Sequence, residues 1–195
     1  MHIPGEGIVV EGDARTPAAP AAPAAWSSLS DVSERSRYDP QMPYDDASRA
    51  ANRARFARLI TQPEGQIDLG LGALHIAADG RPEVDPAPTL AILDALAERV
   101  RIRLDVGDSQ THVLDRLHDV LYRETGFRAP TAAEFHDPRN SLLDLVAWRR
   151  IGLPISLAII ELEVAWRVGL PLTGIGLPGH YIVRSEEHTS ELQSQ

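Results

Sequence analysis

A serine and a histidine form the pair of residues in this sequence best suited to chemistry. Ser156 follows Pro154 at the start of an apolar helical segment, and His180 follows a Pro-Gly pair in a segment with strand character. A hydroxyl and an imidazole are the nucleophile and the general base of many acyl-transfer sites. Each also has a structural interpretation, Ser156 as a helix cap and His180 as a hydrogen-bonding bridge within the turn.

A second polar group, Asp137, Arg139 and Asn140, comes shortly before Ser156 in the chain. Asn140 is a favourable N-cap for a helix predicted from Ser141 to Arg150 and closed by Gly152. The simplest interpretation is a network at the start of that helix. The alternative is that these side chains contact a ligand, so the three are also candidate binding residues.

Neither a metal nor a cofactor is expected. The chain contains no Cys, which excludes disulfides, thiolate metal sites and thiol nucleophiles. His112 and His118 are six positions apart and would lie on different faces of a helix. No His/Glu spacing in the sequence matches a known zinc pattern.

Length and charge limit the class of protein. A chain of 195 residues with 43% hydrophobic residues can form one domain of ordinary size with extensions. The net charge of -9 argues against nucleic acid as a partner. The N-terminus lacks a signal pattern, and the most apolar helix carries Glu161, Glu163 and Arg167. We therefore expect a cytoplasmic protein that does not enter a membrane.

Four amphipathic helices should position these residues from the N-terminal side. Residues 1–45 are Pro/Ala-rich and then polar, which predicts a disordered tail. The region 46–126 follows as a helical bundle. Its helices are predicted from Asp46 to about residue 62, over Ile67–Ala78, from Pro88 to Leu104, and from about Val113 to a stop at Gly126. The apolar face of the first would consist of Ala50, Ala54, Phe56, Ala57, Leu59 and Ile60.

The region 127–184 is predicted to be α+β. Thr131 and Glu134 form a capping-box pattern for a short turn. The helix of about Ile155–Val168 is apolar on nearly all sides, with Ile155 and Trp166 on one buried face, which indicates the central helix of a core. Segments Leu172–Leu177 and Tyr181–Val183 have strand character. The whole chain should be α+β but predominantly helical.

The last residues have a different origin in this interpretation. Residues 185–195, SEEHTSELQSQ, are polar and aperiodic and read as the translation of a common sequencing-library adapter, with Arg184 ambiguous. We expect this segment to be non-native and the chain to be truncated at its C-terminus.

Four sequence blocks then carry a family resemblance: DPRNSLLDLV, RRIGLPISLA, EVAWRVGLPL and GIGLPGHYIV. In order and spacing they resemble the transglutaminase-like core of bacterial SirB-type proteins, which combine that core with an N-terminal helical region. The resemblance is strongest over Asp137 to Val183, and it implies an incomplete papain-like acyl-transfer scaffold in this chain.

Such scaffolds place a Cys at the N-terminus of the central helix, a His on the next strand and an Asp beyond it. His180 matches the His, and the nucleophile position falls at Ser156 or at Pro154. A serine hydroxyl ionises far less readily than a thiol and needs a well-aligned base and an oxyanion hole. The third residue lies beyond the chain, so this polypeptide should be inactive as an enzyme.

Three functions remain open. The first is a non-catalytic, transglutaminase-like interaction or regulatory module with a protein partner. The second is a serine-dependent hydrolase or amidase in the full-length parent, using Ser156 and His180. The third is a helical adaptor that binds through residues 46–126. We take the first as the working hypothesis.

Overall fold

The computed structural model describes residues 46–81, 83–177 and 180–185. The predicted N-terminal tail and most of the adapter-like segment lie outside these residues. The elements are α3 Asp46–Ile60, η1 Glu64–Gln66, α4 Leu69–Gly80, α5 Pro86–Arg101, α6 Gln110–His118, η2 Asp119–Glu124, η3 Pro138–Asn140, α7 Leu143–Arg149, α8 Pro154–Arg167, β1 Leu172–Leu177 and β2 His180–Ser185.

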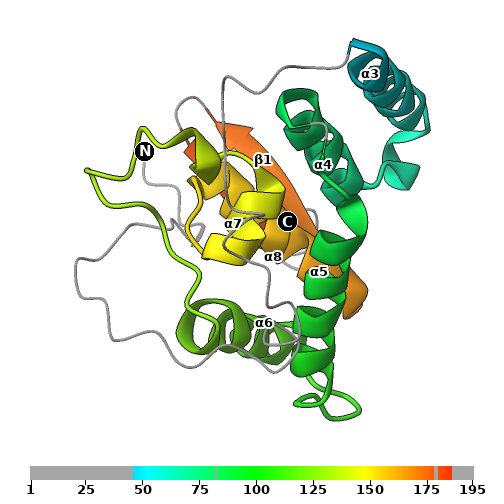
Figure 1. Ribbon diagram of the computed structural model, residues 1–195. Coiled ribbons are helices and arrows are strands. Elements are labelled where there is room, and N and C mark those ends of the chain that lie inside the picture. Colours follow the sequence, from blue (N-terminus) through cyan, green and yellow to red (C-terminus); the bar gives the residue numbers. More distant parts are fainter. Residues whose placement is uncertain (1–45, 82, 178–179, 186–195) are drawn as a thin grey trace, which may run out of the picture.

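The fold is predominantly helical α+β, as the sequence predicted. Helix α8 lies in the middle of the molecule, with α7 beside it and β1 behind (Figure 1). Strands β1 and β2 pair antiparallel, from Leu172 opposite Ser185 to Leu177 opposite His180. Both strands contact α8, so the sheet and the helices α4 to α7 enclose that helix from several sides.

One hydrophobic cluster holds these elements together. It extends from Leu74 in α4 to Leu172 in β1 and includes buried side chains of α5, α6, α7 and α8. Helices α4, α5 and α6 and the predicted core from residue 127 onward therefore share apolar contacts, while the position of a domain boundary stays a prediction. No helix within the described residues is both long enough and apolar enough to cross a membrane.

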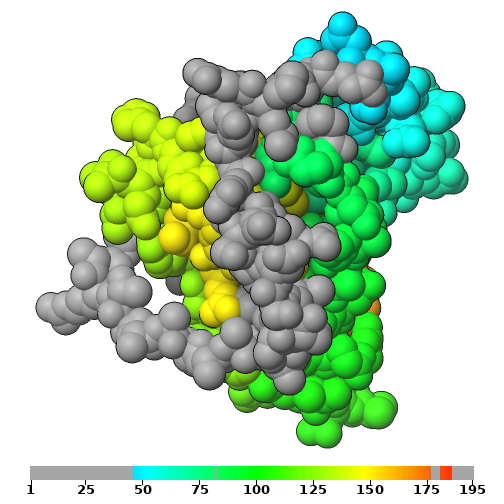
Figure 2. All heavy atoms as spheres, in the orientation of Figure 1, coloured from blue at the N-terminus to red at the C-terminus, as the bar shows by residue number. Residues whose placement is uncertain are grey.

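Helix α3 has the predicted bounds but buries a different face. Its buried residues are Asn52 and Leu59, whereas the predicted face residues Ala50, Ala54, Ala57 and Ile60 are exposed. The amide nitrogen of Asn52 donates to the His75 carbonyl over 2.8 Å, and the amide oxygen of Asn52 lies 2.7 Å from Nδ1 of His75. The prediction failed because the hydrogen bonds between the Asn52 amide and α4 stabilise this face more than burial of three alanine methyl groups would. Figure 2 shows α3 protruding at one edge of the molecule.

Helix α4 begins two residues later than predicted and also ends two residues later, at Gly80. Asp68 caps it by accepting a hydrogen bond from Leu71 N over 2.7 Å. Gly70 has a packing role, because a Cβ there would lie 3.0 Å from the carboxyl carbon of Glu163. The glycine therefore allows α4 and α8 to approach closely.

The next two helices appear in the predicted order. Helix α5 starts at Pro86, two residues before the predicted start at Pro88, and Asp85 caps it. Helix α6 continues into η2, a π-helical turn, and Gly126 ends it with φ +80°. The glycine stop is confirmed, whereas a regular α-helix over the whole segment is not.

The region before α8 differs from the prediction. Asp137 caps the short turn η3, and α7 starts only at Leu143, so Asn140 is not its N-cap. The helix also ends earlier, with Arg150 in the left-handed conformation at φ 59° where Gly152 was expected to act. Gly152 instead prevents a clash, because a Cβ there would lie 2.5 Å from Val146 Cγ1.

The central position predicted for α8 is confirmed, but two of its assigned core residues are not buried. Ile155 is 50% exposed and Trp166 is 44% exposed. The indole of Trp166 donates to the Leu172 carbonyl over 2.8 Å, where the chain turns into β1. This hydrogen bond of the indole N–H holds the Trp166 ring where the chain enters β1, and the ring is partly exposed there.

Candidate functional site

Ser156 is the third residue of α8, and its position follows from the local sequence. Pro154 occupies the first helical position after Leu153, whose backbone is extended with φ -60° and ψ 156°. Ser156 is 3% exposed. A helix N-terminus favours negative charge, so the place suits a nucleophile electrostatically, but the described structure gives it no base.

The loop before α8 is held from two sides. Arg128 N donates to the Arg150 carbonyl over 2.9 Å, and Gly152 N donates to the Arg128 carbonyl over 3.2 Å. On the other side, Leu153 N donates to the Asn140 carbonyl over 3.0 Å. These backbone contacts fix the first turn of α8.

Two of the candidate binding residues, Asp137 and Arg139, form a local ion pair. The Asp137 carboxylate accepts from the Arg139 guanidinium and from the Arg139 backbone N, each over 2.9 Å. Arg149 adds a longer contact of 3.2 Å to the same carboxylate. The hydrogen bonds from Arg139, more than the nearby positive charges, hold the pKa of Asp137 below its usual value.

Asn140 is fully buried and connects this pair to its surroundings. Its amide nitrogen donates to the Glu134 carbonyl over 2.7 Å, and its amide oxygen accepts from Arg149 over 3.1 Å. The structure thus brings Asp137, Arg139 and Asn140 together around Arg149. Their contacts with one another, with Glu134 and with Arg149 support the loop before Ser156, and a ligand-binding role for them stays a prediction.

Glu134 completes the network on its outer side, and the capping contact predicted for it is present. Its carboxylate accepts from Arg128 over 2.9 and 3.0 Å. It also accepts from the Thr131 backbone N and hydroxyl, both over 2.9 Å. The Arg128 hydrogen bonds, followed by those of Thr131, lower the pKa of Glu134 to about 2.

His180 begins β2, and its backbone pairs with Leu177 at the end of β1. The strand contacts α8, so the backbone of His180 belongs to the sheet that packs on the helix of Ser156. The side chain of His180 lies outside what the structure describes. A Ser156 to His180 hydrogen bond therefore stays a prediction.

A buried polar cluster that sequence reasoning missed lies in the middle of α8. Glu161 is 5% exposed, accepts a hydrogen bond from the Tyr122 hydroxyl, and lies 3.1 Å from His118 Nε2. A carboxylate in an otherwise apolar helix is the signal that could have led to it, because buried carboxylates require partners. The described residues contain no group of three or more His, Cys, Asp or Glu arranged to hold a metal ion.

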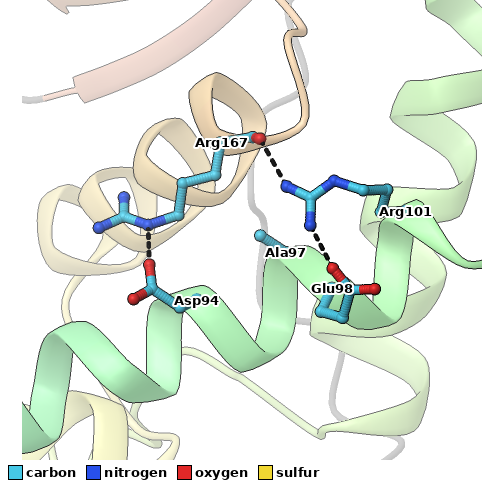
Figure 3. Close-up of a pocket in the computed structure, with 5 residues that line it drawn as sticks. All are labelled: Asp94, Ala97, Glu98, Arg101 and Arg167. Carbon is cyan, nitrogen blue, oxygen red and sulfur yellow. Dashed lines mark hydrogen bonds and ion pairs between the residues drawn. The ribbon is translucent and has the colours of Figure 1, made fainter.

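An open polar depression lies at the other end of α8, far along the helix from Ser156. It has a volume of about 410 Å³ between α5 and the C-terminal turn of α8. Figure 3 shows Arg167 directed at Asp94, over 2.7 Å, and Arg101 bonded to the Arg167 carbonyl, over 2.9 Å. Because its charged groups pair with one another across the depression, these contacts join α5 to α8.

The chain is similar in sequence to bacterial and eukaryotic proteins. The chain is 35% identical to a UPF0162 protein of Xylella fastidiosa over 126 residues, 65% of this chain and 44% of that protein. It is 37% identical to the UPF0162 protein of Pseudomonas aeruginosa over 114 residues, 57% of this chain and 41% of that protein. The human F-box only protein 21 is 32% identical over 75 residues, 38% of this chain and 12% of that protein.

The chain thus spans less than half of the length of the bacterial relatives. No solved structure matches it. The sequence profile of the transglutaminase-like superfamily matches residues 88–193, a range that begins within α5, extends past β2 and includes both Ser156 and His180. By this match over more than half of its length, the chain belongs to the transglutaminase-like superfamily.

Proposed function

We propose that this chain is a SirB-type transglutaminase-like protein that acts as a non-catalytic protein-interaction or regulatory module in the bacterial cytoplasm. The observation that carries the proposal is the state of the nucleophile position. The resemblance assigns that position to Ser156 or to Pro154, in a chain without Cys, and Ser156 is 3% exposed. A serine hydroxyl at that level of burial needs a hydrogen-bonded base to react, because it does not ionise by itself near neutral pH.

The polar groups around the first turn of α8 support the same proposal. Asn140 and Arg149 are joined to each other and to backbone or carboxylate groups of the same segment. Hydrogen bonds of this kind fix a loop in place. A rigid surface around an unreactive centre is the property expected of a scaffold that a protein partner recognises.

The alternative is a serine-dependent hydrolase or amidase in the full-length parent, with Ser156 as nucleophile and His180 as base. Its support is the place of Ser156 in the first turn of α8, where the helix dipole favours a developing negative charge. A hydroxyl in this place would attack a carbonyl group only if the imidazole accepted its proton.

Applied to the full-length parent, a fluorophosphonate probe separates the two functions. We expect no labelling of the wild-type parent, and the same result for Ser156→Ala. The matched control is Ser141→Ala, because Ser141 is an exposed serine of the same segment. Labelling that disappears in Ser156→Ala and persists in Ser141→Ala would establish the hydrolase.

A thiol at the same position tests the burial directly. Since the chain has no Cys, Ser156→Cys introduces a single thiol, and Ser141→Cys introduces a matched exposed one. We expect iodoacetamide to modify Ser141→Cys at least about tenfold faster, because a buried thiol is inaccessible and ionises poorly. Equal rates would mean that the nucleophile position is open, which contradicts the proposal.

A further inference from the structure

Helix α3 packs on α4 through one of its sides. Asn52 and Leu59, its two buried residues, are seven positions apart and therefore lie on the same side. The Asn52 amide donates to the His75 carbonyl of α4, and a Cβ at Gly72 of α4 would lie 3.5 Å from Leu59. The opposite side of α3 faces away from α4, at the edge of the molecule seen in Figure 2.

That opposite side is lined by small, exposed side chains. Ala50 and Ala54 each lie two positions from Asn52, and Ala57 lies two positions from Leu59. Two positions turn a helix by about 200°, so these three alanines, called here the outer side of α3, point away from α4. All three are exposed. Their spacing of four and then three residues is the spacing at which the ridges of one helix pack on another.

Helix α3 is also basic, although the protein is acidic. It contains four arginines and one aspartate, a formal charge of +3, whereas the whole chain carries -9. Arg53 is paired with Asp79 of α4. Arg55 and Arg58 are exposed and form no ion pair with another described residue. Each follows an alanine of the outer side by one position, about 100° of turn, so both guanidiniums lie on the same flank of it.

Charge and side-chain size limit what can cover the outer side. A second α3 would bring arginines against arginines, and like charges across an interface weaken it. Helices that bind anionic membranes insert large apolar residues, whereas the outer side offers only methyl groups. A nucleic acid would extend past α3 over the remainder of the chain, which carries -12 when the +3 of α3 is subtracted from -9. A short acidic segment that touches α3 alone meets none of these obstacles.

We propose that the outer side of α3 is a docking surface for an acidic amphipathic helix of a partner protein, with Arg55 and Arg58 as its charged flank. Alanine methyl groups let the two helices approach closely, and carboxylates of the partner pair with the two guanidiniums. One helix pair buries less area than a standard interface, so the complex is weak and transient. The inference goes beyond the proposed function, because it concerns residues other than Ser156 and holds whether or not that serine reacts.

Fluorescence anisotropy of a labelled peptide measures the docking on the full chain. The probe is an amphipathic peptide of about 21 residues, built from the repeat Glu-Leu-Ala-Ala-Leu-Glu-Ala and long enough to form a helix. The matched probe has Gln in place of every Glu. We expect the Glu peptide to bind at least about fivefold more tightly at low salt, and this advantage to disappear at high salt because exposed charges are screened.

Three variants locate the surface. Arg55→Gln combined with Arg58→Gln should weaken binding of the Glu peptide about fivefold and leave the Gln peptide unaffected. Ala54→Glu places a carboxylate on the outer side and should also weaken the Glu peptide. Arg123→Gln is the control, because Arg123 is 82% exposed on η2, and this variant should bind as the wild type does. If circular dichroism shows the double variant to be unfolded, Arg58→Gln alone replaces it.

The same measurements can overturn the proposal. Equal affinities of the Glu and Gln peptides would do so, as would equal binding of the Glu peptide by the wild type and the arginine variant. Self-association in sedimentation velocity that Ala54→Glu abolishes would assign the outer side to a second copy instead. Binding to anionic lipid vesicles that the arginine variant loses, without binding of the Glu peptide, would assign it to a membrane. Labelling at Ser156 tests the non-catalytic function separately from all of these results.

Discussion

Glu161 and Glu163 lie two positions apart on α8 and are buried to the same degree, 5% and 4% exposed, yet they are satisfied by different chemistry. Because two positions along a helix turn by about 200°, the carboxylates point to opposite sides. Glu163 pairs with Arg167 and accepts from Gly70 N over 2.7 Å. Glu161 accepts from the Tyr122 hydroxyl and lies beside the His118 imidazole.

The two carboxylates differ in whether the neighbouring basic side chain is always charged. The guanidinium of Arg167 is always positive, and the N-terminus of α4 adds a favourable dipole at Glu163. The imidazole beside Glu161 is charged only when it is protonated. Burial, followed by the charge and hydrogen bond of Glu161, raises the pKa of Tyr122 well above its usual value. The attachment of α4 to α8 should therefore be stronger than that of α6 and η2, and the latter should weaken at the alkaline pH at which Tyr122 of the unfolded chain ionises.

Glu163→Ala should have the largest effect. It leaves Arg167 without its buried partner and removes the acceptor of Gly70 N, so we expect a loss of about 3–5 kcal/mol in the free energy of unfolding. Urea denaturation measures the change. The matched control is Glu98→Gln, which breaks an exposed ion pair with Arg101 and should cost less than about 1 kcal/mol. Similar losses in both variants would contradict the importance of burial at Glu163.

Gly70→Ala tests the same attachment from the side of α4. The added Cβ would lie 3.0 Å from the Glu163 carboxyl carbon, and we expect a destabilisation of about 1–3 kcal/mol in urea. Gly72→Ala is the control within the same helix, because its Cβ would make an ordinary contact of 3.5 Å with Leu59. That variant should be neutral or gain up to about 1 kcal/mol from helix propensity. Equal destabilisation by both alanines would rule out a specific contact with Glu163.

Glu161→Gln should cost less than Glu163→Ala, about 1–2 kcal/mol, because an amide oxygen can still accept the Tyr122 hydroxyl. A double-mutant cycle with Tyr122→Phe isolates the pair. We expect a coupling energy of about 1 kcal/mol between the two sites. Strict additivity would show that the Tyr122 hydroxyl does not stabilise Glu161.

The smallest effect concerns alkaline pH. The folded protein holds the Tyr122 pKa well above 10.0, so above that pH the unfolded chain ionises at Tyr122 while the folded chain does not. Stability from this phenol is complete below about pH 10 and is lost as the pH rises further, by at most about 1.4 kcal/mol per unit. Urea denaturation at about pH 9, 10 and 11 should show a steeper decline for wild type than for Tyr122→Phe. Parallel declines would mean that this phenol ionises normally.

Local signals allowed the sequence to predict most of the helices and both strands. Hydrophobic periodicity places α5 and α8, and the glycine stop at Gly126 needs only its own backbone conformation. The same signals failed at Asn140 and at Trp166, whose environments depend on residues elsewhere in the chain. The resemblance led to the transglutaminase-like superfamily and to the region of Ser156 and His180. The contacts that hold the first turn of α8 around Ser156 could be identified only from the fold.

The sequence by itself determined the predominantly helical α+β class, the order of the elements, the superfamily and the lack of a thiol. It also showed that α8 carries charges in an apolar helix. Only the tertiary structure decided how those charges are satisfied, because Gly70 is 93 residues from Glu163 and Tyr122 is 39 residues from Glu161. Secondary structure follows from interactions between near neighbours in the chain, whereas a buried carboxylate takes whichever donor the packing of helices brings to it.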